Sequence, residues 1–75
     1  MTYEEIRAAR LRTPFRPFKL RMKNGEEHLI QEPMALVISQ RVLAYVNAKT
    51  GIIEETTPGA AESITFIDHA ETTNV

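Results

Sequence analysis

The stretch P-F-R-P-F-K-L-R-M-K-N-G-E-E-H-L-I, residues 14–30, decides the fold because it joins an alternating strand, a turn and a return strand. Hydrophobic and basic residues alternate over residues 18–23, which predicts a strand with one buried and one charged face. Asn24-Gly25 follows directly and is the strongest short-range signal for a β-hairpin. We therefore expect an antiparallel hairpin whose outer face is basic.

The length of the turn sets the pairing of this hairpin, and two registers are open. A two-residue loop pairs Leu20 with Leu29. A three-residue loop, with Gly25 in the left-handed conformation, pairs Phe18 with Ile30. We prefer the three-residue loop slightly, because it gathers most hydrophobic residues of the two strands on one face. That face then consists of Phe18, Leu20, Met22, His28 and Ile30.

The segment before the hairpin predicts a helix over residues 3–12. Thr2 and Glu5 have the spacing of a capping box, in which each residue satisfies a backbone N–H of the other. Pro14 ends the helix, since the residue before a proline avoids the helical conformation. Isolated helices below about 12 to 15 residues are marginal in water, so this helix must pack on the rest of the chain.

The remainder of the chain predicts short strands separated by turns. Apolar runs over residues 34–38 and 42–46 each contain more hydrophobic residues than one face of a half-exposed strand needs. A strand is expected over residues 52–56. A single helical turn over 60–63 is expected to lead into a last strand over 63–68.

These elements predict one mainly β domain over residues 1–75. The N-terminal helix is followed by five short strands over residues 17–68, which form a strongly bent antiparallel sheet or a small Sm-like or SH3-like barrel. Coiling would hide the strand edges, and the helix would cover one open end. Residues 69–75 are polar and are expected to fray.

Composition and termini exclude several classes of protein. With 43% hydrophobic and 25% charged residues, the chain has the balance of a folded domain. It contains no cysteine, so disulfides and thiolate metal sites are excluded. No signal-peptide pattern is present at the start, and no apolar run approaches the roughly 18 residues of a membrane span. We expect a cytoplasmic protein without membrane contact.

No motif points to catalysis or to a bound cofactor. The three glycines lie in separate turns, so no phosphate-binding loop is present. Ser39 and Ser63 lack the sequence context of a nucleophile elbow. The two histidines, His28 and His69, are too few to predict a metal site. We therefore expect a non-enzymatic protein with no catalytic, cofactor-binding or metal-binding residues.

Charge divides unevenly along the chain. Residues 1–23 contain seven basic and two acidic residues, whereas residues 24–75 contain two and eight. One interpretation is a surface for RNA or single-stranded nucleic acid, in which Phe15 and Phe18 stack on bases. The other, which we favour, is that the two halves are neighbours and neutralise each other. The basic residues that would contact phosphate are Arg10, Arg12, Arg16, Lys19 and Arg21.

The two apolar runs also predict a contact surface. Each must be buried on both sides within the domain or be covered by another protein molecule. We therefore expect a binding or assembly module that acts through protein–protein contact, either with a partner protein or as a homo-oligomer. Weak binding of RNA or single-stranded nucleic acid is the alternative. The residues expected to mediate self-association are Met34, Leu36, Ile38, Leu43 and Tyr45.

Over roughly residues 3–67, the chain resembles a group of small uncharacterised bacterial proteins. The residues that carry the resemblance are P-F-R-P-F-K-L at 14–20, K-N-G at 23–25 and E-P at 32–33. The shared pattern is a short helix, P-F-x-P-F, a basic strand, an Asn-Gly or Asp-Gly turn, a later proline and an isoleucine-rich last strand. The resemblance implies a fold and no activity. A weaker similarity connects the order of elements to Sm-like and SH3-like barrels.

Overall fold

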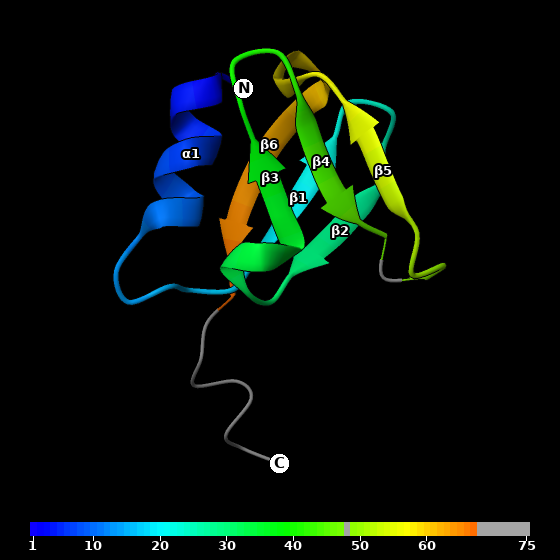
Figure 1. Cartoon of the computed structure of the whole chain (residues 1–75). Helices are drawn as coiled ribbons and strands as arrows, with labels where there is room; N and C mark the ends of the chain where they lie inside the picture. The colour runs from blue at the N-terminus through cyan, green and yellow to red at the C-terminus, as the bar shows by residue number, and fades with distance from the viewer. Residues whose placement is uncertain (48, 68–75) are drawn as a thin grey trace.

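The computed structural model describes residues 1–47 and 49–67. In this part of the chain the strands form two three-stranded antiparallel sheets, with strand orders β2-β1-β6 and β3-β4-β5 (Figure 1). We call them the first and the second sheet. The elements in chain order are α1 (Tyr3–Leu11), β1 (Phe18–Met22), β2 (Glu27–Ile30), the 3-10 helix η1 (Pro33–Ala35), β3 (Leu36–Ile38), β4 (Leu43–Val46), β5 (Ile53–Thr56), the 3-10 helix η2 (Pro58–Ala60) and β6 (Ala61–Phe66).

The prediction of a mainly β fold with an N-terminal helix is confirmed, but the five-stranded single sheet and the closed barrel are wrong. Pro33 lacks a backbone N–H and begins η1, so the chain after the hairpin is divided into β2 and β3. β2 pairs with β1, whereas β3 pairs with β4. No strand of the first sheet pairs with a strand of the second within the described residues.

The hairpin has the register of the three-residue loop. Phe18 pairs with Ile30, as the preferred alternative predicts. The N–H of Gly25 donates to the carbonyl of Met22 at 2.9 Å, and Gly25 has a φ of +93°. Only glycine adopts this conformation without strain, so Gly25 fixes the loop length and with it the inward face.

Hydrophobic side chains from both sheets and from α1 form one core. Ile6 and Ala9 are the buried residues of α1, which lies beside β3 and β6 in Figure 1. β1 alternates between buried and exposed residues along its whole length, as the sequence predicts. The largest fully buried side chains are Phe18, Ile6, Leu20, Ile30, Leu36 and Leu43.

Helix α1 begins and ends where the sequence predicts. The capping box is formed: the N–H of Thr2 donates to Glu5 Oε1 at 2.9 Å, and the N–H of Glu5 donates to Thr2 Oγ1 at 3.2 Å. The N–H of Thr2 and its hydroxyl, which lies 3.1 Å from Glu5 Oε1, both donate to the Glu5 carboxylate and lower the pKa of this carboxyl. The helix ends at Leu11, with Arg12 as its C-terminal cap.

The last strand differs slightly from its prediction. The single helical turn lies at Pro58–Ala60, where proline occupies the first turn, and not over 60–63. β6 therefore begins at Ala61, earlier than expected. The predicted end of this strand at Asp68, the histidine at position 69 and the tail over 69–75 lie outside the described residues.

Candidate functional site

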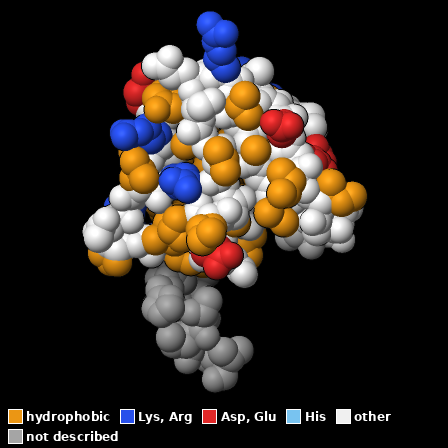
Figure 2. Space-filling view, in the orientation of Figure 1, with side chains coloured by type: hydrophobic (Ala, Val, Ile, Leu, Met, Phe, Trp, Pro, Cys, Tyr) orange, Lys and Arg blue, Asp and Glu red, His pale blue; other side chains and the backbone are white. Residues whose placement is uncertain are grey.

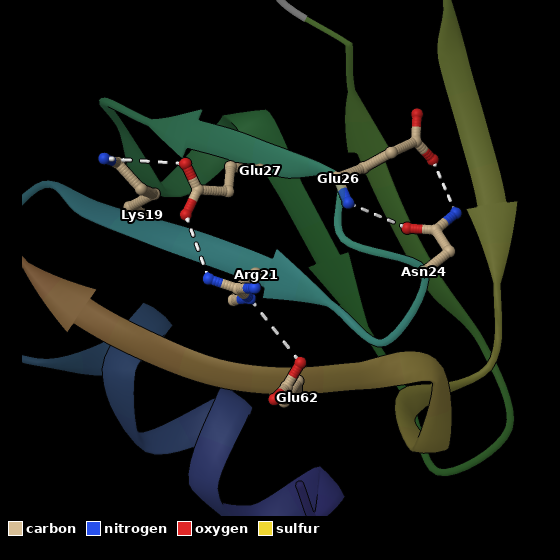
Figure 3. Close-up of polar contacts among 6 residues, drawn as sticks. All are labelled: Lys19, Arg21, Asn24, Glu26, Glu27 and Glu62. Atoms are coloured by element: carbon tan, nitrogen blue, oxygen red, sulfur yellow. Dashed lines mark hydrogen bonds and ion pairs between the residues drawn. The ribbon is translucent and has the colours of Figure 1, made fainter.

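The basic face of β1 is neutralised by neighbouring strands. Lys19 Nζ lies 3.7 Å from Glu27 Oε1, and Arg21 Nη1 lies 3.8 Å from Glu27 Oε2 (Figure 3). On its other side, Arg21 Nε lies 3.6 Å from Glu62 Oε2. Such exposed pairs contribute about 0 to 1 kcal/mol each to stability, but they remove an unopposed row of positive charge. The preferred interpretation is that acidic residues of the second half of the chain neutralise basic residues of the first half. It holds for Lys19 and Arg21.

Arg10 has a structural position. Its Nε donates to the carbonyl of Pro33 at 3.0 Å and to that of Leu36 at 2.6 Å. These two carbonyls bracket η1, so the guanidinium joins α1 to the start of β3. Arg10 was predicted to contact phosphate, but its Nε is already engaged inside the domain.

Arg12 and Arg16 lie over the ring of Phe66. Their guanidinium carbons are 5.5 and 5.2 Å from the ring centroid, within the range of cation–π attraction. Phe66 is 36% exposed, whereas Phe18 is fully buried and therefore cannot stack on a base. Phe15 is half-buried and packs against the core. The exposed aromatic beside the arginines is thus Phe66, which sequence reasoning missed because only the pairing of β6 with β1 brings it there.

Three residues predicted to mediate self-association lie in the core. Leu36 and Leu43 are fully buried, and Tyr45 is 5% exposed. Contact through these side chains would require the core to open, so they are corrected to core residues. Ile38 is half-buried and packs against the core, while Met34 is 85% exposed.

The opposite face of the second sheet carries exposed hydrophobic side chains. The pairing of Val37 with Ala44, and of Val46 with Ile53, places these four residues on the face away from the core. Val37 is 57% exposed and Ile53 is 69% exposed. Figure 2 shows hydrophobic side chains spread over this side of the molecule. We call this surface the outer face; it consists of Val37, Val42, Ala44, Val46, Ile53 and Glu55.

A polar cluster connects the two sheets. The ring centroid of His28 on β2 lies 4.3 Å from the ring centroid of Tyr45 on β4. Tyr45 Oη donates to Glu54 Oε1 at 3.1 Å, and Asn47 Nδ2 donates to Glu54 Oε2 at 2.9 Å. Burial raises the pKa of Tyr45 to about 12, and the carboxylate of Glu54 adds to this effect. His28 is buried, as its predicted inward position requires, and its Nε2 has no hydrogen-bond partner within the described residues.

The raised pKa of Tyr45 predicts a loss of stability in alkali. The unfolded chain releases this proton near the ordinary pKa of 10, whereas the folded chain holds it up to about 12. The contribution to stability is complete below the unfolded pKa and is lost as the pH rises through the folded one. Urea denaturation between about pH 9 and about pH 11 should show this loss in the native chain. Tyr45→Phe should flatten the profile relative to the native chain, and Tyr3→Phe should not; equal profiles for all three proteins would contradict the assignment.

Comparison of the chain with protein-family models, curated proteins and solved structures finds no match. The resemblance to small bacterial proteins and to Sm-like and SH3-like barrels therefore stays a prediction. Among the described residues, no helix is both long and apolar enough to cross a membrane. Residues 1–47 and 49–67 also contain no group of three or more side chains that could hold a metal ion.

Proposed function

We propose that this chain is a non-enzymatic protein-binding module that associates with a second copy of itself through the outer face. The observation that carries the proposal is the exposure of Val37 and Ile53 on one face of a regular sheet. Exposed hydrophobic side chains on one sheet face are typical of interaction sites. A sheet face can be covered by a second sheet face packed against it.

A second copy suits this face for two reasons. The same patch on two molecules covers itself in a two-fold interface, which is the commonest symmetry of soluble oligomers. Glu55 on this face and Arg41, which directly precedes Val42 in the chain, are exposed, and neither forms an ion pair with another described residue. A second copy can therefore supply an opposite charge to each of them.

Binding of nucleic acid has less support from the geometry. Of the five side chains that would contact phosphate, Lys19 and Arg21 pair with carboxylates and Arg10 donates to backbone carbonyls. Arg12 and Arg16 remain, beside Phe66. Two guanidinium groups supply little of the electrostatic attraction on which non-specific binding depends.

Sedimentation across protein concentrations tests the self-association. We expect the native chain to form dimers as its concentration rises, and Ile53→Lys to raise the dissociation constant at least about tenfold, because it places a charge within the proposed apolar contact. Leu11→Lys is the control, since Leu11 is 49% exposed on α1, which carries no residue of the outer face. A native chain that stays monomeric at the highest soluble concentration, or equal effects of the two lysines, would overturn the proposal.

A further inference from the structure

Strand β6 presents free backbone groups at the edge of the first sheet. The N–H of Ile67 donates to the carbonyl of Pro17 at 2.9 Å, which makes these two residues a hydrogen-bonded pair at the end of the ladder. Hydrogen-bonded and non-bonded pairs alternate in an antiparallel ladder. The paired register of β1 and β6 therefore directs the N–H and C=O groups of Ile64 and Phe66 away from β1. Within the described residues, these outward groups have no other strand beside them.

A groove of about 340 Å³ lies along this same edge. One wall contains Ile64 and Phe66, the two residues with outward backbone groups. The other wall is one face of α1. The helix residues that line it, from Glu5 to Arg12, follow the spacing of three or four positions that places side chains on one face. Small side chains at Ala8 and Ala9 leave space between the helix and the strand. We call this the edge groove; it is lined by Met1, Glu5, Ala8, Ala9, Arg12, Ile64 and Phe66.

The edge groove is positively charged at one end. The positively charged amino group of Met1 donates a hydrogen bond to the carbonyl of Ala61 at 3.1 Å, so the start of β6 lies beside the start of α1. The Glu5 carboxylate, which also lines the groove, offsets the charge of this amino group. Arg12 lies over Phe66 and therefore marks the opposite end, where Arg16 also lies over the ring. Neither arginine forms an ion pair with another residue of the described chain. Arg16 Nη2 donates to the carbonyl of Ile67 at 3.4 Å, whereas the Arg12 guanidinium lines the groove and is available for an acidic group.

We propose that the edge groove binds an extended peptide segment of a partner protein, which adds a strand to β6 and places an acidic side chain beside Arg12. In strand addition, backbone hydrogen bonds supply affinity and alternate side chains supply specificity. Here the outward N–H and C=O groups of Ile64 and Phe66 can form the backbone hydrogen bonds. The apolar walls and the basic end of the groove supply the specificity. Small hydrophobic side chains of the peptide enter the groove, and its carboxylate lies at the basic end. This site is separate from the outer face of the second sheet.

Selection from a library of random decapeptides displayed on phage, with the full chain immobilised, tests the proposal. We expect the enriched sequences to alternate small hydrophobic residues with others and to contain Asp or Glu near one end. One enriched peptide, labelled with fluorescein, then serves as the probe for binding by fluorescence anisotropy. If selection enriches no sequence, or only sequences that bind the native chain and the groove variant Ala8→Trp equally well, the proposal is overturned.

Three variants decide where the labelled peptide binds. Ala8→Trp fills the groove from an exposed helix position and should abolish binding, while circular dichroism shows that the fold is retained. Arg12→Glu should weaken binding by about tenfold or more, because it replaces the partner of the acidic residue with a like charge. Arg7→Glu is the matched control on α1, since Arg7 does not line the groove. Undiminished binding to Ala8→Trp, or equal effects of the two glutamates, would overturn the proposal.

Amide hydrogen exchange supplies a second measurement. Bound peptide should slow the exchange of the amide protons of Ile64 and Phe66, which become hydrogen-bonded only when a strand is added. Ile53→Lys should bind the peptide normally, so failure of the proposed dimer leaves this result unaffected. Unchanged exchange at both amides would overturn strand addition. A single-stranded oligonucleotide that competes with the peptide, and whose binding Arg12→Glu abolishes, would instead assign the groove to nucleic acid.

Discussion

Leu36→Ala is expected to lower the free energy of unfolding by about 2 to 5 kcal/mol, which is the usual cost of removing a buried leucine side chain. Leu36 is fully buried and belongs to the core cluster formed by both sheets and α1. Its replacement leaves a cavity that this small core cannot fill by rearrangement. A domain of this size has a total stability of only about 5 to 15 kcal/mol, so the variant should unfold at far lower denaturant concentration.

Leu29→Ala is the matched control for this substitution. Leu29 is 39% exposed on β2, so the same change should cost less than about 1 kcal/mol. Urea denaturation followed by circular dichroism compares the two variants with the native chain. Equal losses in the two variants would show that Leu36 is not in the core. A Leu36→Ala variant that keeps its stability but loses self-association would restore Leu36 to the contact surface.

Arg10→Met is expected to lower the free energy of unfolding by about 1.5 to 3 kcal/mol, the range for hydrogen bonds made by a charged group. The substitution keeps most of the aliphatic length but removes the donor to the carbonyls of Pro33 and Leu36. Both carbonyls lie at the junction of α1, η1 and β3. The Leu36 carbonyl would lose the guanidinium donor, and the Pro33 carbonyl would keep only the N–H of Leu36. Without this guanidinium, α1 should separate from β3 more readily, and the hydrophobic contacts of Ile6 and Ala9 would still hold the helix on the core.

Arg7→Met is the control for the loss of positive charge on the same helix. Arg7 is exposed, so its replacement should change stability by no more than about 0.5 kcal/mol. Amide hydrogen exchange in α1 adds a local measurement, because Arg10→Met should speed exchange in the helix more than in β1. If Arg10→Met matches Arg7→Met in both measurements, Arg10 does not anchor the helix.

Local chemistry explains the elements that were predicted correctly. The capping box of Thr2 and Glu5 begins α1, and Pro14 lies just beyond its end. The alternation of residues 18–23 gives the buried face of β1, and Gly25 sets the register of the hairpin. Each of these signals acts over a few residues, so the sequence expresses it directly.

The second sheet shows where sequence patterns fail. The runs over residues 34–38 and 42–46 are apolar on both faces, so their periodicity cannot say which face turns inward. Burial of Leu36 and Leu43 leaves Val37 outside, and this choice depends on how the sheet packs over the first sheet and α1. The residues predicted for self-association therefore included the buried Leu36 and Leu43 and did not include the exposed Val37 and Ile53, on which our proposal rests.

By itself, the sequence determined the capped helix and the hairpin turn, and it favoured the observed register over one alternative, since each depends on residues that are near in the chain or paired by one turn. Only the tertiary structure decided that the strands divide into two sheets, that Arg10 holds η1, and that Phe66 lies beneath Arg12 and Arg16. The physical reason is that these contacts join segments far apart in the chain, and their geometry follows from how the sheets and α1 share one core.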